Sequence, residues 1–258
     1  MMTRRLLSAE RHQQILERVA SEAAVDYGSL ADELGVSTMT IRRDVRILEE
    51  AGYIKTTRGG ASAQLLTSQD VLINPRAMDQ SIAKAQIGQY AASLIENGEV
   101  IFLGTGSTTA VFAQFLPIDL DLTVITPSLP HASLLASRGI NVVSTGGTIA
   151  TDDLAQTGVI AIETMMRFYA TRTIIGSGGV SKNGGLTEFD QVIAEINRTM
   201  VIRSEEVIVL VDPSKAGITA NYRVSGVDAV DEFITSSEGR PALQKALGSG
   251  RQILTPNG

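Results

Sequence analysis

The sequence has no cysteine, no tryptophan and only two histidines among its 258 residues. Without cysteine the chain forms no disulfide and offers no thiolate to a metal, and His12 and His131 are too few for a multi-histidine site. The absence of cysteine is also typical of proteins of the reducing cytoplasm. We therefore expect neither a metal nor a cofactor.

Aromatic residues are scarce at 4%, whereas hydrophobic residues reach 43%. That hydrophobic share is enough for a normal buried core, which must be built from Ile, Leu, Val and Ala side chains. The length of the chain suits one large domain, or a small domain followed by a larger one.

Long apolar runs are also missing, because no stretch reaches the roughly 18 residues that a membrane-spanning helix needs. Arg4 and Arg5 are followed by Glu10 and Arg11 rather than by the apolar segment of a secretion signal. We expect a soluble, cytoplasmic protein that does not contact a membrane.

The formal net charge of −6 argues at first against a nucleic-acid partner. Residues 1–62, however, hold nine Lys and Arg and nine Asp and Glu, while the rest of the chain holds 13 and 19. The negative charge therefore belongs to the C-terminal part, and a basic surface near the N-terminus stays compatible with DNA binding.

Residues 1–62 have the order of elements of a winged helix-turn-helix domain. Two short helices joined by a tight turn are followed by a strand, a Gly-Gly turn and a second strand, which form the wing. The predicted elements are a helix over residues 8–22, a helix over 30–34 between Ser29 as N-cap and Gly35 as C-cap, a helix from Ser37 to about Glu50, an extended segment over 25–27 and a wing over 53–61.

The third helix and the wing supply the side chains that we expect to face DNA. Arginine can donate two hydrogen bonds to guanine or hold a phosphate, and helix N-terminal amides also suit phosphate. Arg42-Arg43 alone is more typical of a solvated helix, but the turn, the caps and the wing together favour DNA binding. The sequence does not separate base contacts from phosphate contacts. The predicted DNA-binding residues are Ser37, Thr38, Met39, Thr40, Arg42, Arg43, Arg46 and Arg58.

Residues 63–80 lack periodicity and are expected to be a linker, and residues 81–258 are expected to form an α/β domain. After a helix that runs from Ser81 to Asn97-Gly98, short apolar runs alternate with helical stretches, a pattern typical of a largely parallel sheet covered on both faces. The predicted strands are 100–103, 122–126, 142–144, 172–176, 207–211, 232–235 and 252–254, and the predicted helices are 108–116, 129–138, 157–169, 189–202 and 238–247.

Loops rich in Gly, Ser and Thr follow several of these strands. Such loops at the carboxyl ends of parallel strands bind ligands, and a loop that opens a helix suits a phosphate. Lys215 is the leading phosphate partner, while Arg76 and Lys84 are also compatible with linker-face charges. The predicted effector-binding residues are Thr105, Gly106, Ser107, Thr108, Thr109, Thr126, Ser128, Gly146, Gly147, Lys215, Arg76 and Lys84.

Other polar residues are expected to have no catalytic role. Asp152-Asp153 suits an exposed loop better than a sugar contact, and His131 suits a structural role. The acidic residues Glu188, Asp190 and Glu195 are predicted to lie on a helix with ordinary surface spacing.

The stretch from Leu30 to Gly52, with Gly59-Gly60-Ala61 at the wing, resembles the signature of the DeoR family of transcriptional regulators. The resemblance continues in family order through Arg76 and Lys84, Gly106–Thr109, Gly146-Gly147, Gly184–Thr187 and Asp212–Lys215. It implies a ribose-5-phosphate-isomerase-like C-terminal domain and a repressor of sugar-use genes that a phosphorylated sugar releases.

Departures from the family pattern at Gly104, Pro127 and Arg172-Thr173 are expected to lie around the ligand pocket, so the resemblance does not name the effector.

Two other functions stay open. The stretch Ile101–Thr109 also resembles the phosphate loop of ribose-5-phosphate isomerases, so an isomerase-like or deaminase-like enzyme is one alternative. A transcriptional activator with the same ligand switch is the other. Helix-turn-helix proteins bind repeated half-sites, so we expect a homodimer or homotetramer on a double-stranded operator, with a phosphorylated sugar or polyol as effector.

Overall fold

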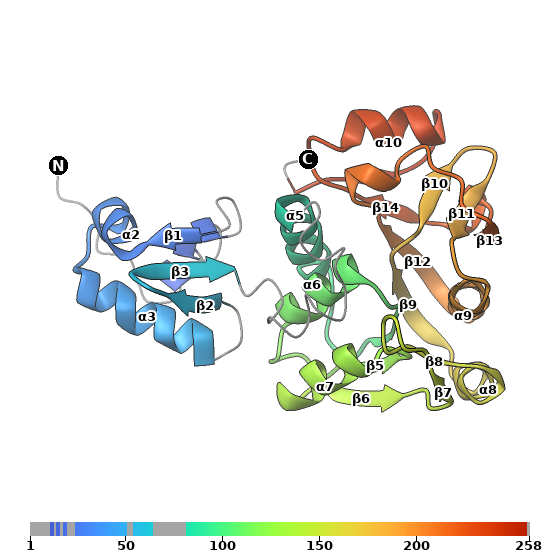
Figure 1. The fold of residues 1–258 in the computed structure, drawn as a ribbon, viewed down its shortest axis with the longest axis horizontal. Helices are drawn as coiled ribbons and strands as arrows, with labels where there is room; N and C mark the ends of the chain where they lie inside the picture. The colour runs from blue at the N-terminus through green and yellow to red at the C-terminus, as the bar shows by residue number, and fades with distance from the viewer. Residues whose placement is uncertain are drawn as a thin grey trace. The chain divides into compact units, whose positions relative to one another are not determined.

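The computed structural model describes residues 11, 12, 14, 15, 18, 19, 24–50, 54–63 and 81–256. The chain divides into two compact units, residues Met1–Val71 and Leu72–Gly258 (Figure 1). No helix of the described residues is both long and apolar enough to cross a membrane.

The N-terminal unit combines helices with a small antiparallel sheet. Its strands pair in the order β1-β3-β2, so the wing hairpin of β2 and β3 is extended by β1, the strand that precedes α2 and α3. The described elements are β1 (Ala24–Asp26), α2 (Tyr27–Leu34), α3 (Thr38–Glu50), β2 (Ile54–Thr57) and β3 (Gly60–Ala63). The predicted helix over 8–22 lies partly outside the described residues, and those that are described within 11–19 are helical.

The helix caps follow from local hydrogen bonding. Ser29 was the predicted N-cap of the second helix, and this is wrong. α2 begins at Tyr27 and its N-cap is Asp26, whose carboxylate accepts hydrogen bonds from the amides of Gly28 and Ser29 at 2.8 and 2.9 Å. The carboxylate is the stronger acceptor for these two amides. Gly35 ends α2 in the left-handed conformation, and the Ser37 hydroxyl accepts the amide of Thr40, as predicted.

An aliphatic core and one buried carboxylate hold the N-terminal unit together. Ile15, Ile41 and Val45 are fully buried in the core. Asp44 is buried beside them, 2.5 Å from Arg11 Nε and 3.1 Å from His12 Nε2. Burial raises the pKa of Asp44, but the hydrogen bonds from Arg11 and His12 lower it by more, so this pKa lies below the ordinary value.

The wing is fixed to the rest of the unit at two points. The amide and hydroxyl of Thr56 donate to Glu49 Oε1 at 2.7 and 2.6 Å, which joins β2 to the end of α3. A Cβ at Gly60 would overlap the carbonyl oxygen of Val25, so only glycine lets β3 approach β1 this closely.

The C-terminal unit contains one seven-stranded sheet in which every neighbouring pair is parallel. The predicted α/β class with its parallel sheet is confirmed. The strand order is β15-β14-β12-β9-β4-β5-β6. The strands are β4 (Val100–Leu103), β5 (Thr123–Thr126), β6 (Asn141–Ser144), β9 (Ala170–Ile175), β12 (Ser204–Leu210), β14 (Glu232–Ile234) and β15 (Ile253–Leu254).

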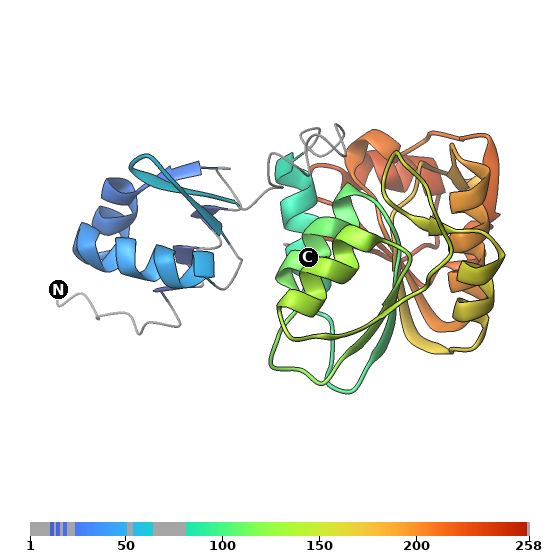
Figure 2. The same ribbon diagram turned by 60° about the horizontal axis from the view of Figure 1, so that its bottom comes forward.

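Helices cover both faces of this sheet (Figure 2). One face carries α5, α6 and α7, and the other carries α8, α9 and α10. The helices are α5 (Ser81–Ala92), α6 (Ser107–Phe115), α7 (Leu129–Ser137), α8 (Val159–Met166), α9 (Gln191–Ile202) and α10 (Arg240–Leu247), with short 3-10 turns η2 (Pro213–Lys215) and η3 (Val227–Ala229). α5 ends five residues before the predicted Asn97.

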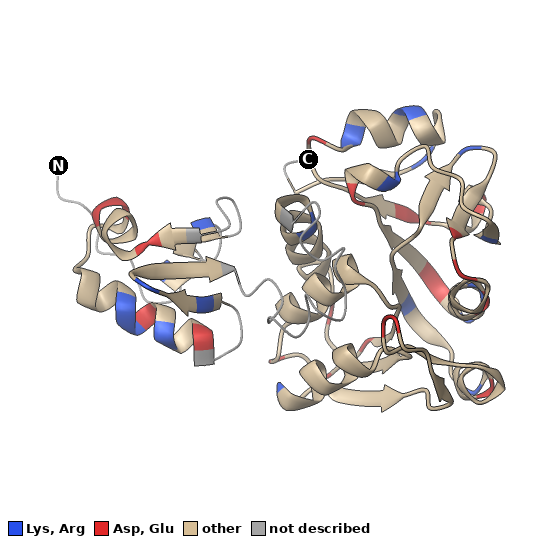
Figure 3. Ribbon diagram, viewed as in Figure 1, with Lys and Arg blue, Asp and Glu red and all other residues tan. Residues whose placement is uncertain are grey.

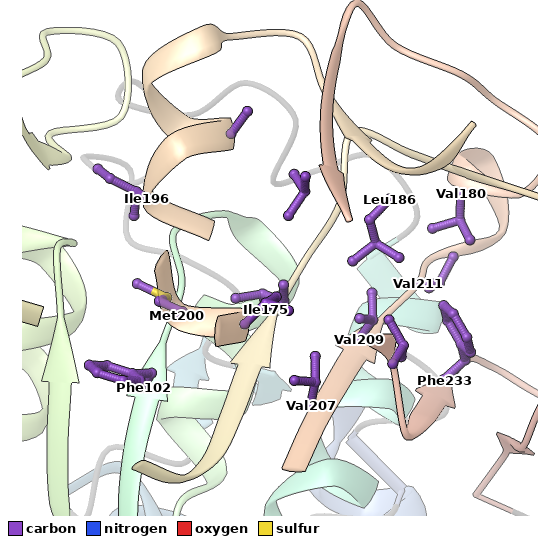
Figure 4. Packing of buried hydrophobic residues seen from close by; sticks show 14 of the residues in the cluster. Phe102, Ile175, Val180, Leu186, Ile196, Met200, Val207, Val209, Val211 and Phe233 are labelled. Carbon is purple, nitrogen blue, oxygen red and sulfur yellow. The ribbon is translucent and has the colours of Figure 1, made fainter. Parts of the chain in front are cut away.

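Each face of the sheet packs against its own hydrophobic core, and successive residues of a strand point to opposite faces. Val207 and Val209 pack with Phe102 on the α9 side (Figure 4), whereas Ile208 and Leu210 pack on the α6 side. Because both faces are buried, the strands appear in the sequence as continuous apolar runs rather than as alternating ones.

Two antiparallel additions were not predicted. β10 (Gly179–Ser181), β11 (Gly185–Glu188) and β13 (Tyr222–Ser225) form a three-stranded sheet, and β7 (Thr148–Ile149) pairs with β8 (Gln156–Thr157). Their strands are too short to show periodicity in the sequence. Glu188 therefore ends a strand and Asp190 caps α9, so their predicted place on a helix is wrong.

Candidate functional site

The first candidate site is the outer side of α3. Met39, Arg42, Arg43 and Arg46 are exposed, and so are Ser37 and Thr38 at its start, while Thr40 is half-buried. Figure 3 colours the basic residues of this helix and of β2. The exposed residues of this set on α3 therefore share one solvent-facing surface, opposite the buried stripe of the helix.

The arginines of this surface differ in their surroundings. Arg42 lies over the ring of Tyr27, 5.3 Å from its centroid, which restrains its guanidinium. Arg43 forms no ion pair with any residue that the structure describes. Arg58 is exposed in the wing turn, and Lys55 on β2 is a further exposed cation that the sequence analysis did not single out.

The second candidate site is a cavity of about 380 Å³ in the C-terminal unit. It lies at the carboxyl ends of β4, β9 and β12, three neighbouring strands of the sheet. The chain leaves β4 toward α6 on one face and leaves β9 toward α9 on the other, and ligands bind in open α/β sheets at such a switch point. The lining residues are Lys84, Thr105, Gly106, Ser107, Thr108, Thr109, Ala150, Asp152, Asp153, Thr157, Gly176, Ser177, Gly178, Glu188, Phe189, Asp190, Val192, Ile193, Leu210, Asp212, Ser214 and Lys215.

One wall of the cavity is the start of α6. Gly106 is the N-cap residue and no side chain caps the helix there. Ser107 and Thr108 follow with their hydroxyls, and both line the cavity. An uncapped helix N-terminus with adjacent hydroxyls has the donors and the positive end of a dipole that an anion requires.

Two lysines from distant segments also line the cavity. Lys84 on α5 is buried, and Lys215 in η2 is half-buried. Lys215 makes no ion pair with any described residue. Together with the start of α6, the two ammonium groups suit a dianion such as a phosphate monoester.

Five carboxylates also line the cavity, and several of them accept hydrogen bonds from backbone amides. Asp190 accepts the amides of Val192 and Ile193, and Asp212 accepts the amide of Ser214. Asp152 and Asp153 lie at the end of the β7–β8 hairpin and Glu188 at the end of β11. Asp152 is exposed and Asp153 is half-buried in a turn, as predicted for an exposed loop, but both also line the cavity, which nothing local in the sequence shows.

Four predicted effector residues do not line the cavity: Thr126, Ser128, Gly146 and Gly147. They lie where the β7–β8 hairpin is attached. The amide of Gln156 donates to the carbonyl of Pro127, and its side-chain oxygen accepts the amide of Gly146 at 3.1 Å. Arg76 lies outside the described residues.

The departures from the family pattern are explained in part by packing. A Cβ at Gly104 would lie 2.8 Å from Cγ2 of Ile175. Arg172, which was expected near the pocket, does not line it: its guanidinium lies 2.8 Å from Glu99 Oε1 and 2.5 Å from Glu206 Oε2. Burial raises the pKa of Glu99 above its ordinary value although Arg172 opposes the shift.

The chain joins a winged helix-turn-helix unit, which has an exposed basic helix, to an α/β unit that contains a cavity. This combination is typical of ligand-sensing transcriptional regulators. The comparisons with known proteins give the family. The model of the DeoR-like helix-turn-helix domain matches residues 11–65, and that of the DeoR C terminal sensor domain matches residues 79–237. The chain belongs to the DeoR family of DNA-binding transcriptional regulators.

Relatives match over nearly the whole chain. The sequence is 30% identical over 251 residues to the uncharacterized HTH-type transcriptional regulator YulB of Bacillus subtilis, covering 97% of each chain. It is 28% identical over 239 residues to the glycerol-3-phosphate regulon repressor of Escherichia coli, covering 92% of this chain and 94% of that protein. Ribose 5-phosphate isomerase A of Methanocaldococcus jannaschii is similar over 51% of this chain and 52% of its own, with 22% identity and a TM-score of 0.39.

Proposed function

We propose that this regulator represses genes of carbohydrate metabolism and that a phosphorylated sugar or polyol in the cavity releases it from DNA. One observation carries the effector class: Lys84, Lys215 and the uncapped start of α6 all line one cavity, together with hydroxyl and carboxylate side chains. The lysines and the helix start suit the phosphate, and the carboxylates and hydroxyls suit sugar hydroxyls. The name of the Escherichia coli relative, a glycerol-3-phosphate regulon repressor, supports the same class.

The DNA side of the proposal rests on the exposed surface of α3. We propose that α3 lies in a major groove, and that the exposed wing residue Arg58 contacts the backbone or the minor groove. Arg43 is the best candidate for a base contact because it is exposed and not engaged with described side chains. The residues proposed for DNA contact are Ser37, Thr38, Met39, Thr40, Arg42, Arg43, Arg46 and Arg58.

In the cavity we propose that Thr105, Gly106, Ser107, Thr108 and Thr109 hold the phosphate together with the two lysines. The residues Thr126, Ser128, Gly146 and Gly147 are proposed to position the β7–β8 hairpin rather than to touch the effector. Arg76 stays a prediction from the sequence.

The switch itself is a difference in effector affinity between two arrangements of an oligomer. We propose a homodimer or homotetramer in the cytoplasm that places recognition helices on repeated half-sites. An effector that prefers the arrangement with lower DNA affinity weakens operator binding, with a coupling of about 1–3 kcal/mol.

A titration tests this function. A duplex that the wild-type protein selects from a random pool is bound by the protein, and sugar and polyol phosphates such as glycerol 3-phosphate and fructose 6-phosphate are added in a mobility-shift assay. We expect at least one phosphate ester to release the DNA and to raise the melting temperature, while its unphosphorylated counterpart does neither. Lys215→Met should keep operator binding and lose the response. A panel of phosphate esters without any effect on operator binding would refute the switch.

We propose that the chain is not an enzyme. Proton transfer between sugar carbons needs a carboxylate that is free to act as a base and is held at the reacting carbons. Of the carboxylates that line the cavity, Asp153, Asp190 and Asp212 accept backbone amides, Glu188 accepts from Asn197 at 3.2 Å, and Asp152 is exposed on the hairpin loop. Turnover of ribose 5-phosphate or glucosamine 6-phosphate by the purified protein would favour the isomerase-like or deaminase-like alternative. An activator would use the same contacts, and a transcription assay at the selected promoter distinguishes it from a repressor.

A further inference from the structure

Helix α8 presents an apolar surface to solvent. Val159, Ile160 and Met166 are 71%, 62% and 46% exposed, and Tyr169 just beyond the helix is 56% exposed. Large apolar side chains gathered on one helix mark an interaction surface more often than chance exposure does. The opposite side of α8 is anchored normally, since Ala161 and Met165 are fully buried.

Two charges lie on the same outer side of α8. Glu163 and Arg167 are both exposed and are one helical turn apart, yet neither forms an ion pair with any residue that the structure describes. An antiparallel helix with the same sequence would present them in reverse order. Glu163 would then face the partner's Arg167, and Arg167 would face the partner's Glu163.

The apolar residues are arranged with the same symmetry. Val159 and Ile160 lie at the start of α8 and Tyr169 lies just after its end. In an antiparallel pair with Glu163 opposite the partner's Arg167, the start of one helix meets the end of the other, and Met166 lies near the two-fold axis. An isologous dimer interface uses the same surface on both subunits, so that surface must be self-complementary. The charges and the apolar residues of α8 both meet this requirement.

We propose that α8 is a self-association surface, at which two copies of this chain pair their α8 helices antiparallel about a two-fold axis. The expected energetic centre is the apolar cluster, with the two ion pairs at its rim setting the register.

The position of α8 joins this surface to the cavity. The β7–β8 hairpin that carries Asp152 and Asp153 ends at Thr157, a cavity residue, and only Gly158 separates Thr157 from α8 (Figure 1). A ligand that moves the hairpin therefore acts on the helix that holds the dimer. This consequence rests on the proposed function, whereas the self-association does not and is tested without any effector.

The first test compares two isoleucines of similar exposure. Ile160→Glu places a charge on α8, and Ile118→Glu, at a residue 52% exposed on the loop before β5, is the matched control. Sedimentation velocity of the full-length protein over a concentration series should give a weaker self-association for Ile160→Glu and an unchanged one for Ile118→Glu. Circular dichroism melting should show that both variants are folded.

The second test exchanges the charges. Glu163→Arg and Arg167→Glu each place like charges opposite one another twice and should raise the dissociation constant at least about tenfold. The double variant restores both pairs and should return to the wild-type value. Because the natural chain has no cysteine, Met166→Cys should also be joined to its copy by a short bis-maleimide, whereas Ile118→Cys should not.

Three results would overturn the proposal. These are a wild-type protein that stays monomeric across the concentration series, an oligomer that Ile160→Glu leaves unchanged, and a charge exchange in which the double variant is no better than the single ones.

Discussion

The two candidate binding sites of this chain are built in different ways. The residues proposed for DNA contact lie on α3, at its start and in the adjacent hairpin, between Ser37 and Arg58. The cavity combines residues from Lys84 to Lys215, which come from α5, α6, the β7–β8 hairpin, β11, α9 and η2. A site on one helix can be found from local spacing, whereas a site between loops depends on which strands are neighbours in the sheet.

The units also differ in how their stability is distributed. The small N-terminal unit has a single aliphatic core, to which the ion pair of the buried Asp44 with Arg11 and the close approach at Gly60 are added. The C-terminal unit has a separate aliphatic core on each face of its sheet. Single substitutions should therefore damage the small unit without reaching the large one.

The largest effect is expected from Gly60→Ala. The added methyl group overlaps the carbonyl of Val25 in a backbone-to-backbone contact that cannot relax, so the N-terminal unit should lose about 3 kcal/mol. Gly59→Ala is the matched control, because a Cβ there has open space and costs only about 1 kcal/mol for its left-handed backbone. Hydrogen exchange measured by mass spectrometry follows each unit separately. Equal losses of stability in both units would contradict the expectation that the substitution affects the N-terminal unit alone.

A smaller effect, of about 2 kcal/mol in operator affinity, is expected from Arg43→Ala. The exposed guanidinium has no structural partner among the described residues, so its removal should weaken DNA binding about 10- to 100-fold and leave the fold and the effector-induced thermal shift unchanged. Arg240→Ala on α10 is a control for a lost surface charge. Equal loss of DNA and effector binding would show that the two sites are not separate.

The smallest effect is an opposite response of the two units to acid. The pKa of Asp44 is lowered, so the folded unit binds fewer protons than the unfolded chain, and the stability that Asp44 contributes is lost as the pH falls below about 4. Burial raises the pKa of Glu99 and of Glu232, so their cost to the C-terminal unit is relieved as the pH falls through the raised values toward about 4.5.

Two variants separate the pH-dependent contributions of Asp44 and Glu99 to stability. The destabilisation caused by Asp44→Asn should be largest at neutral pH and shrink on acidification, because the wild-type carboxylate becomes protonated as well. The stability of wild type relative to Glu99→Gln should instead rise as the pH falls. Urea titrations at pH 7, 5 and 3 measure both differences in stability, and differences that change in the same direction with pH would contradict the assignment.

Much of the architecture was predictable from local pattern. All seven strands of the large sheet coincide with predicted apolar runs, and α3 and the wing lie where the caps and the glycines indicate. The errors have two causes. Asp26 rather than Ser29 caps α2, which is a choice between two nearby cap residues, whereas Glu188 ends a strand that pairs with a segment more than thirty residues later. Short hairpin strands gain their stability from such pairing, so no sequence window contains the cause.

The sequence by itself determined the winged helix-turn-helix, the parallel sheet and the Gly-Ser-Thr loop of α6, since each depends on side-chain periodicity or on caps a few residues apart. Only the tertiary structure decided which loops share a cavity. The order of strands brings β4, β9 and β12 together and excludes Thr126 and Gly146, and the β7–β8 hairpin carries Asp152 and Asp153 to the ligand side. Strand order follows from how the helices pack on the two faces, and that packing depends on the whole chain.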